Sequence, residues 1–250
     1  TTQIGEGKRY TPTQYFEQSN KKPLLVMNTT FFEFVHNSNL NIVMNDGKML
    51  AYQQHSLAGR GKDTLTYRHP FGSAIGINKK RKADVAWLYT DTVLRLPYAS
   101  QQPISFFKDS VADHTADFML QKGDFKKWKM KTAVGGGPVL VQQGEVKITN
   151  NQELKFAGKA IDDKHPRSAM GYTADGKLIF MAIEGRFPGK AEGASLTQTA
   201  LLLKGVGCIE ALNLDGGGSS CLLINGKETI QPSDKGGQRA VPAVFVVQEK

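Results

Sequence analysis

Short apolar runs, separated by turns rich in glycine, asparagine and aspartate, recur along the 250 residues and favour many short strands over long helices. The longest runs, such as Pro23–Met27 and Pro242–Val247, are far shorter than the roughly 20 apolar residues of a membrane-spanning helix. We therefore expect a globular protein without a membrane-inserted segment. The chain also begins without a charged-then-apolar leader, so any signal peptide is expected to have been removed or never to have existed.

The pattern of apolar runs and turn residues predicts strands at Leu24–Asn28, Asn39–Met44, Lys48–Tyr52, Gly72–Ile77, Asp84–Tyr89, Pro138–Gln142, Glu145–Ile148, Ala169–Thr173, Lys177–Ile183, Ile209–Leu214, Cys221–Ile224 and Val241–Val247. Helices are expected after the capping residue Thr11, over Asp109–Leu120 and over Ser195–Lys204. Regular strand–helix alternation is lacking, so the predicted class is α+β, with a mixed, largely antiparallel sheet packed by two or three helices. Residues 1–250 are expected to form a single domain in which residues 1–23 are a helical lead-in.

An excess of basic residues, 32 Lys and Arg against 23 Asp and Glu, gives a formal net charge of +9. This charge favours anionic partners such as phosphate groups, acidic polysaccharide, nucleic acid or a membrane surface. The two basic runs, Lys79–Lys82 and Lys126–Lys131, are short, and short runs at turns are usually solvated surface. Binding of nucleic acid is therefore not expected, although the second run contains an aromatic residue, as single-strand binders do.

Neither the cysteines nor the histidines and acids show the spacing of a metal site. The groups considered are Asp113, His114 and Asp117, and Asp162, Asp163 and His165. Cys208 and Cys221 have small apolar neighbours and are expected to be buried free thiols.

The densest polar cluster follows the apolar run Ile209–Leu214 and comprises Asn213, Asp215, Gly216, Gly217, Gly218, Ser219 and Ser220. Consecutive glycines let the backbone approach a ligand and can turn N–H groups toward an anion. Asp215 can act as a general acid or base, a nucleophile or a cation ligand. A plain solvated turn is the alternative, but so many functional groups at one strand exit favour a site.

A second group of polar residues flanks the expected hairpin that turns at Asp175–Gly176. His165 and Arg167 stand at the start of its first strand, and Glu184 and Arg186 follow its second. Because the start of one hairpin strand lies opposite the end of the other, these four residues should be neighbours in space. Arginine suits bidentate phosphate or carboxylate binding; a surface ion-pair network is the alternative, and His165 alone better fits a structural hydrogen bond.

Two further candidates lie at strand ends. Asn28 is interpreted as a substrate-facing amide, although Asn28-Thr29-Thr30 also fits the N-glycosylation pattern. Gly135-Gly136-Gly137-Pro138 opens a strand, and a β-bulge or a close backbone crossing explains it at least as well as a site does.

In order and spacing, several of these segments together resemble the phosphodiester glycosidase family. They are Asn28…Phe31-Phe32, Gly135–Val141, His165–Gly171, Glu184–Arg186 and Asn213–Ser220. The resemblance runs from about Leu24 to the chain end, through Arg239–Pro242. It implies a hydrolase acting on a sugar whose anomeric oxygen is esterified to phosphate. Bacterial members of similar length imply a secreted, periplasmic or cell-envelope location.

The chain departs from the family pattern at two places. The family usually has Asn-Gly-Gly-Phe-Phe where this chain has Asn28-Thr29-Thr30-Phe31-Phe32, so the substrate is expected to differ. The family often has Asp-Gly-Arg where this chain has Glu184-Gly185-Arg186, which keeps the carboxylate and lengthens its reach by one methylene.

Cleavage beside a phosphate requires charge neutralisation at the leaving group and a carboxylate for the oxocarbenium-like centre. Asp215 and Glu184 are the candidate catalytic carboxylates, and the choice of nucleophile or base stays open because it depends on their separation. The substrate- and phosphate-binding candidates are Arg167, Arg186, Gly216, Gly217, Gly218, Ser219, Asn28, Asn213 and His165. Asn28 and Asn213 are expected to orient sugar hydroxyls or an N-acetyl group.

The expected partner is therefore a phosphorylated glycan or a sugar-1-phosphodiester, with the oligomeric state left open. No cofactor is expected, although a divalent cation near Asp215 is left open. Two alternatives remain: a non-catalytic envelope module that binds anionic glycan, and a phosphoesterase.

Overall fold

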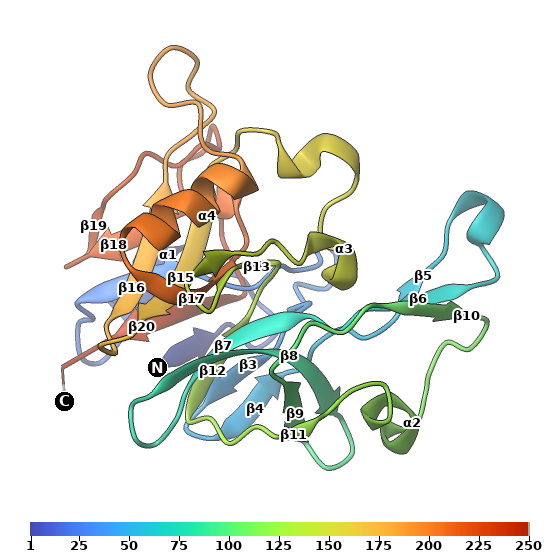
Figure 1. Ribbon diagram of the computed structural model, residues 1–250. Coiled ribbons are helices and arrows are strands. Elements are labelled where there is room, and N and C mark those ends of the chain that lie inside the picture. The colour runs from blue at the N-terminus through green and yellow to red at the C-terminus, as the bar shows by residue number, and fades with distance from the viewer. Residues whose placement is uncertain (250) are drawn as a thin grey trace.

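The computed structural model describes residues 1–249 and arranges them in four β-sheets with four α-helices (Figure 1). Every strand pair within these residues is antiparallel. The expected mixed sheet is therefore wrong, and the fold is richer in strands than the α+β prediction. The reason is that hairpins and loops, rather than crossover helices, join the strands.

The terminal sheet contains both ends of the chain. In spatial order its strands are β1 (Thr2–Ile4), β20 (Ala243–Val247), β2 (Leu25–Asn28), β18 (Leu222–Ile224) and β19 (Lys227–Glu228). Helix α1 (Pro12–Gln18) contacts β2, and its N-terminus carries the expected Thr11 cap, in a reciprocal capping box with Gln14. The first 23 residues contain the expected short helix and, before it, the strand β1, which pairs with β20.

The central sheet is the largest and lies below the terminal sheet in Figure 1. Its strands, in spatial order, are β11 (Lys126–Lys127), β9 (Leu96–Ser100), β8 (Ala83–Asp91), β7 (Ser73–Ile77), β12 (Thr132–Gly135), β3 (Val43–Asn45) and β4 (Lys48–Ala51). A small arm sheet extends away from it, with strands β10 (Phe107–Asp109), β6 (Tyr67–His69) and β5 (Leu57–Ala58) and a 3₁₀ turn at Gly61–Asp63.

The site sheet consists of β14 (Glu145–Val146), β13 (Val139–Gln142), β17 (Cys208–Asn213), β15 (Arg167–Thr173) and β16 (Leu178–Ile183). Helix α4 (Leu196–Gly205) lies across it in Figure 1 and contacts β13 and β17. The predicted helix is confirmed: Ser195 caps it, and Leu196, Ala200 and Leu203 are fully buried against the sheet. Helix α3 (Asn150–Glu153) and 3₁₀ turns at Gly158–Ile161 and Gly217–Ser219 complete this part.

The main core lies where the terminal, central and site sheets meet. Met27 from β2, Trp87 from β8 and Leu212 from β17 are almost fully buried in one apolar cluster. This shared core fixes the ends of β2, β15 and β17 relative to one another, and the functional residues lie at those ends. The two cysteines are buried and free, as predicted.

The helix expected over Asp109–Leu120 is wrong. Asp109 ends β10, and α2 covers only Ala116–Leu120, capped by Thr115. The Asp109 carboxylate accepts the Val111 N–H at 3.0 Å and contacts a ring nitrogen of His114 at 2.8 Å. A short acidic side chain that binds nearby groups in this way competes with helix formation, so the chain turns before α2 begins.

Within residues 1–249, every helix falls short of the length and apolar character that a membrane crossing requires.

Candidate active site

The glycine bend after β17 meets the open end of the β15–β16 hairpin, as the sequence predicted. Antiparallel pairing places Ala169 of β15 opposite Asn213 of β17. Four residues beyond Asn213, the N–H of Gly217 donates to the carbonyl of Pro166 at 2.8 Å. The hydrogen bond joins the bend to the segment that carries His165 and Arg167.

Each of the first two glycines of the bend lies against an arginine. A Cβ at Gly216 would lie 2.8 Å from the Pro166 carbonyl oxygen and 3.7 Å from the Arg167 Cα. Gly217 has φ +60°, and a Cβ there would lie 2.8 Å from Nη2 of Arg186. Glycine is required here because only a bare backbone admits both neighbours at this distance.

The third glycine lies against an arginine that the sequence did not single out. A Cβ at Gly218 would overlap Nη2 of Arg239 and an oxygen of Asp234. The Arg239 guanidinium binds Asp234 through Nε at 2.8 Å and Nη2 at 3.0 Å, and its Nη1 lies 3.4 Å from the Ser219 hydroxyl. Arg239 also lies over the ring of Phe34, 5.6 Å from its centroid. The bend therefore lies against the guanidinium groups of Arg186 and Arg239 and against the main chain and aliphatic side chain of Arg167.

Two hydrogen bonds to its main-chain groups hold Asp215 in place. Its N–H donates to the Thr29 carbonyl at 2.8 Å, and its carbonyl accepts Nδ2 of Asn28 at 2.6 Å. Burial raises the pKa of its carboxyl to about 6, against the opposing effects of hydrogen bonds from Ser219 and the Gly216 N–H. The side chain is nevertheless partly accessible. A carboxyl that titrates near neutral pH in an accessible position is suited to acid–base or nucleophilic chemistry.

Lys155 is a functional candidate that sequence reasoning missed. Burial lowers the pKa of its ammonium to about 8, and the negative charges of Glu153 and Asp215 oppose that effect. Its Nζ lies 5.0 Å from the centroid of the Phe31 ring. Lys155, Phe31 and Glu153 line a cavity of about 170 Å³. A cation with few water contacts next to Asp215 can stabilise negative charge on a substrate.

Glu153, the acidic neighbour of Lys155, is a fixed part of the scaffold. Its carboxylate accepts the N–H of Ser73 at 3.0 Å, Nε1 of Trp87 at 3.2 Å and the hydroxyl of Thr149 at 2.6 Å. These bonds anchor α3 to β7 and β8, so the backbone that carries Lys155 is rigidly positioned.

Arg167 is almost fully buried, and its guanidinium donates hydrogen bonds to two main-chain carbonyl groups. Nε donates to the Ala194 carbonyl at 2.9 Å and Nη2 to the Asp163 carbonyl at 2.8 Å. Burial lowers its pKa to about 10, so it remains cationic at neutral pH. It also lies 5.8 Å from the ring centroid of Phe156, an aromatic residue that the sequence did not single out. Arg167 is therefore a fixed charge under the bend.

Three buried polar atoms at this site have no hydrogen-bond partner within residues 1–249. They are Nδ1 of His165, Oδ1 of Asn213 and Oγ of Ser220. Burial, followed by the charges of Arg167 and Arg186, lowers the pKa of His165, so its ring is neutral at pH 7. Unpaired buried polar atoms are uncommon and costly, so these three atoms are candidates for a hydrogen bond to a ligand or to water.

Glu184 follows β16 and lies at the edge of the site. Its Oε2 accepts the N–H of Gln231 at 2.7 Å, and its Oε1 lies 3.9 Å from Nζ of Lys190. Among residues 1–249, no hydrogen bond or ion pair links it directly to Asp215. The structure therefore brings Asp215 together with Arg239, Lys155 and the bend, whose first two glycines lie against Arg167 and Arg186. Glu184 lies beside Gln231 and Lys190 instead.

The amide of Asn28 is used within the protein, which differs from the expected contact with a sugar. Besides binding Asp215, it accepts the Ser168 hydroxyl at 2.8 Å and the Cys221 N–H at 3.0 Å. The threonines that depart from the family pattern also bind protein groups: the Thr29 hydroxyl donates to the Ala243 carbonyl at 3.1 Å, and that of Thr30 donates to Asn39. These branched side chains are buried and do not line the cavity of Lys155.

Two of the N–H groups that were expected to bind phosphate already donate hydrogen bonds within the protein. The Gly217 N–H binds Pro166, and the Gly216 N–H binds the Asp215 carboxylate. These two N–H groups are therefore not free to bind phosphate.

The two basic runs contribute to a different cavity, of about 630 Å³, on the central sheet. It is lined by Lys79, Lys80, Lys127 and Lys129, among others, and shares no residue with the cavity of Lys155. Trp128 is buried there and donates Nε1 to Asp84 at 2.6 Å, so it does not present the exposed ring that base stacking uses.

Within residues 1–249, the one group of three close metal-ligand side chains lies on the arm sheet, away from Asp215.

Comparison with known proteins agrees with this geometry. A sequence profile of the phosphodiester glycosidase family matches residues 21–248. A stretch of 78 residues is 41% identical to the SPbeta prophage-derived uncharacterized protein YomE of Bacillus subtilis and covers 31% of this chain and 12% of that protein. A stretch of 102 residues is 28% identical to N-acetylglucosamine-1-phosphodiester alpha-N-acetylglucosaminidase of Mus musculus, covering 40% of this chain and 19% of that enzyme. The matched stretches thus span less than a fifth of these relatives.

Two solved structures share the fold. The zebrafish N-acetylglucosamine-1-phosphodiester alpha-N-acetylglucosaminidase catalytic domain, auto-inhibited by its pro-peptide, superposes with a TM-score of 0.66 at 21% identity, covering 99% of this chain and 69% of that one. A Burkholderia pseudomallei protein described as exported superposes with a TM-score of 0.61 at 16% identity, covering 96% and 68%. Because the sequence profile extends over nearly all of the chain, the protein belongs to the phosphodiester glycosidase family.

Proposed function

We propose that the protein is a glycoside hydrolase that cleaves the bond between an anomeric carbon and the oxygen of a phosphodiester, releasing free sugar. The observation that carries the proposal is Asp215, a carboxyl with a pKa of about 6 beside a glycine bend that lies against the guanidinium groups of Arg186 and Arg239. Family membership supports this class of reaction. Relatives are named for an N-acetylglucosamine-1-phosphodiester, so that compound class is the first substrate to test.

The leaving group in this reaction is a phosphate monoester, whose second pKa of about 6 lets it depart as a dianion with little protonation. The main requirement is therefore positive charge. Arg186 and Arg239 lie beside the bend, and Lys155 contributes a charge near Asp215. Arg167, which is fixed by two carbonyl groups, adds to the same positive potential. The Ser219 hydroxyl and the Gly218 N–H supply further donors.

Asp215 supplies the carboxylate that stabilises the oxocarbenium-like centre, and Glu184 is the second carboxylate, positioned at the edge of the site. A separation of about 5–5.5 Å with a substrate bound gives retention through a glycosyl intermediate, whereas a longer one gives inversion by a water molecule. Analysis of the product anomer by NMR in the first minutes of reaction distinguishes the two courses.

The unpaired polar atoms are the groups proposed to orient the sugar. They are Oδ1 of Asn213, Nδ1 of His165 and the Ser220 hydroxyl, which are buried and contact a sugar only once the side chains around them move. Asn28 acts indirectly, because its side chain holds the main chain of Asp215 rather than the substrate.

A phosphorylated glycan is the proposed natural partner, and nucleic acid is not. A secreted, periplasmic or cell-envelope location is supported by the shared fold of the Burkholderia pseudomallei protein described as exported. None of the proposed steps requires a cofactor, and an assay after treatment with EDTA tests whether a divalent cation near Asp215 is needed.

The experiment is product analysis with the methyl phosphodiester of α-N-acetylglucosamine in water enriched in ¹⁸O. The proposal predicts free N-acetylglucosamine that carries ¹⁸O, together with unlabelled methyl phosphate, because the C1–O bond breaks. Release of the sugar 1-phosphate and methanol would instead identify a phosphoesterase. Binding without turnover, unaffected by Asp215→Asn, would identify a module that only binds anionic glycan.

A further inference from the structure

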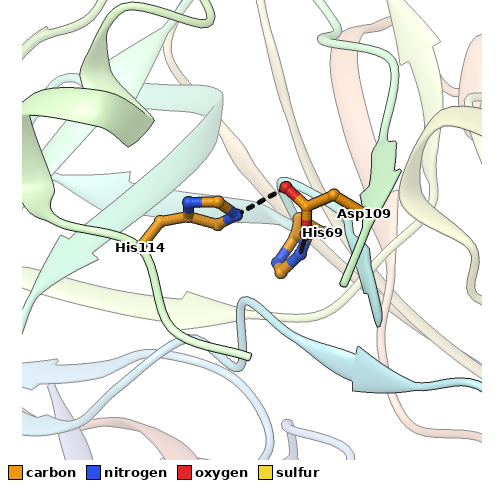
Figure 2. A group of neighbouring side chains, drawn as sticks. All are labelled: His69, Asp109 and His114. Carbon is orange, nitrogen blue, oxygen red and sulfur yellow. Dashed lines mark hydrogen bonds and ion pairs between the residues drawn. The ribbon is translucent and has the colours of Figure 1, made fainter. Parts of the chain in front are cut away.

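A compact group of side chains on the arm sheet has no part in the proposed reaction. His69 ends β6, Asp109 ends β10, and His114 lies in the loop before α2. Nε2 of His69 lies 3.1 Å from one oxygen of Asp109, and Nε2 of His114 lies 2.8 Å from the other. Figure 2 shows both imidazole rings directed at the one carboxylate. Antiparallel pairing of β6 with β10 creates this arrangement by placing His69 opposite Phe107.

We propose that His69, Asp109 and His114 bind a divalent transition-metal ion such as Zn²⁺. Two imidazole nitrogens and one carboxylate are a donor set that zinc prefers, with a fourth position left for water. One possible ligand atom from each residue lies within 4.8 Å of the others. Zinc bonds of about 2.0–2.2 Å bring such atoms to roughly 3.4 Å from one another, so a small inward movement of the side chains closes the site.

The surroundings fix the two rings in orientations that suit a metal. Nδ1 of His69 lies 2.9 Å from the hydroxyl of Ser56, the type of outer contact that sets the tautomer of a ligand histidine. The His69 ring stacks on Phe107 with centroids 4.6 Å apart, and the His114 ring stacks on Phe118 with centroids 4.1 Å apart. His69 is fully buried and His114 nearly so, while Asp109 is partly exposed. An ion can therefore enter from solvent beside the carboxylate.

Binding replaces the hydrogen bonds within the cluster. When no metal is bound, each Nε2 that carries a proton donates it to the carboxylate of Asp109. When a metal ion takes the Nε2 lone pair of such a neutral ring, the ring proton moves to Nδ1, which in His69 lies 2.9 Å from the Ser56 hydroxyl. The single negative charge of Asp109 offsets half of the charge of the ion. The bound ion connects β6, β10 and the loop before α2, so it also stabilises the arm sheet.

The test is titration of the chelator-stripped chain with ZnCl₂ by calorimetry at pH 7.5. The proposal predicts that one ion binds per chain. Asp109→Asn and His114→Ala should each weaken binding by at least tenfold to a hundredfold. Circular dichroism without metal confirms that each variant is folded.

His36→Ala is the matched control, because His36 also contacts a carboxylate, Glu33, at 3.0 Å but is largely exposed. It should bind zinc as the parent does. In the parent, free zinc at about 100 times Kd should raise Tm by roughly 5 °C, and in His114→Ala it should not.

Co²⁺ provides an independent readout in the parent chain, since a His₂Asp site with water gives visible absorption bands typical of tetrahedral coordination. Absence of stoichiometric binding by the parent, or binding that survives His114→Ala, would overturn the proposal. Hydrolysis of a sugar phosphodiester does not enter into any of these measurements, so the metal site and the proposed function can fail separately.

Discussion

The side chain of Asn28 donates a hydrogen bond of 2.6 Å to the main-chain carbonyl of Asp215, 187 residues further along the chain. The same side chain accepts hydrogen bonds from the Ser168 hydroxyl and the Cys221 N–H. One amide thus connects β2, β15 and the residue before β18 to the glycine bend. The position of the proposed catalytic carboxylate therefore depends on a residue that need not touch the substrate.

Asn28→Ala should remove this connection. We expect kcat/KM to fall at least tenfold, because Asp215 loses its fixed position, and the free energy of unfolding to fall by about 1–3 kcal/mol, because three buried polar partners lose hydrogen bonds. Steady-state kinetics and urea unfolding measure the two effects. Asn78→Ala is the control: Asn78 accepts two N–H groups of an exposed turn, so its loss should leave kcat/KM unchanged.

Asp215→Asn should inactivate the enzyme and stabilise the protein at neutral pH. We expect kcat/KM to fall by at least about two decades, because the proposed catalytic carboxylate is lost. The pKa of Asp215, about 6 in the folded protein, lies above its ordinary value of 3.8. The folded state therefore holds the proton more tightly than the unfolded state, so stability is lost as the pH rises from about 4 to about 6 and the full loss is present at pH 7.

The gain in stability from Asp215→Asn should consequently be about 1–3 kcal/mol at pH 7 and should disappear as the pH falls from 6 toward 4. Chemical unfolding of both proteins across this range measures it. A variant that is less stable than the parent at pH 7 would show that burial does not disfavour the Asp215 charge.

The acidic side of the pH profile should report Asp215. We expect kcat/KM to decline below about pH 6, where the carboxylate becomes protonated. Because the Ser219 hydroxyl lowers the pKa of Asp215, Ser219→Ala should move this decline to higher pH. An unchanged profile in Ser219→Ala would assign the decline to another group.

The basic side of the profile should report Lys155. Its pKa of about 8 predicts a decline of kcat/KM above pH 8, as the ammonium loses its proton and the site loses a positive charge. Lys155→Arg keeps the charge to much higher pH, so the decline should disappear even if the maximal rate is lower. A decline that persists in Lys155→Arg would contradict this assignment.

Gly217→Ala should weaken substrate binding more than it weakens folding. A methyl group there lies 2.8 Å from Nη2 of Arg186 and displaces that guanidinium, so KM should rise at least tenfold. Gly144→Ala is the matched control, because Gly144 has φ +76° but no atom within 4 Å of an added Cβ. Both variants should lose about 1 kcal/mol from backbone strain, and only Gly217→Ala should change KM.

The convergence of the hairpin and the glycine bend could be predicted because local signals determine it. The turn at Asp175–Gly176 sets the register of β15 with β16, and that register brings Arg167 and Glu184 to the same end. Helix α4 could be predicted equally well, since its capping residue and its apolar face are adjacent in sequence.

Lys155 and Arg239 could not be found in this way. Each is one of 32 basic residues and lies outside the predicted elements, and only the tertiary fold distinguishes it from solvated surface. The helix predicted over Asp109–Leu120 failed for a related reason. The carboxylate of Asp109 binds His69, 40 residues earlier, as well as the nearby Val111 and His114, and these contacts together override a locally helical pattern.

The contact of each bend glycine with an arginine also determines where specificity can be engineered. A side chain added at Gly216 would clash with the Pro166 carbonyl, and one added at Gly217 or Gly218 would clash with the guanidinium of Arg186 or Arg239, so these positions tolerate little variation. Phe31 and Phe156 pack edge to face, one beside Lys155 and the other beside Arg167. Substituting either of them changes no charged residue. Libraries aimed at new sugars should therefore randomise the aromatic pair and leave the bend intact.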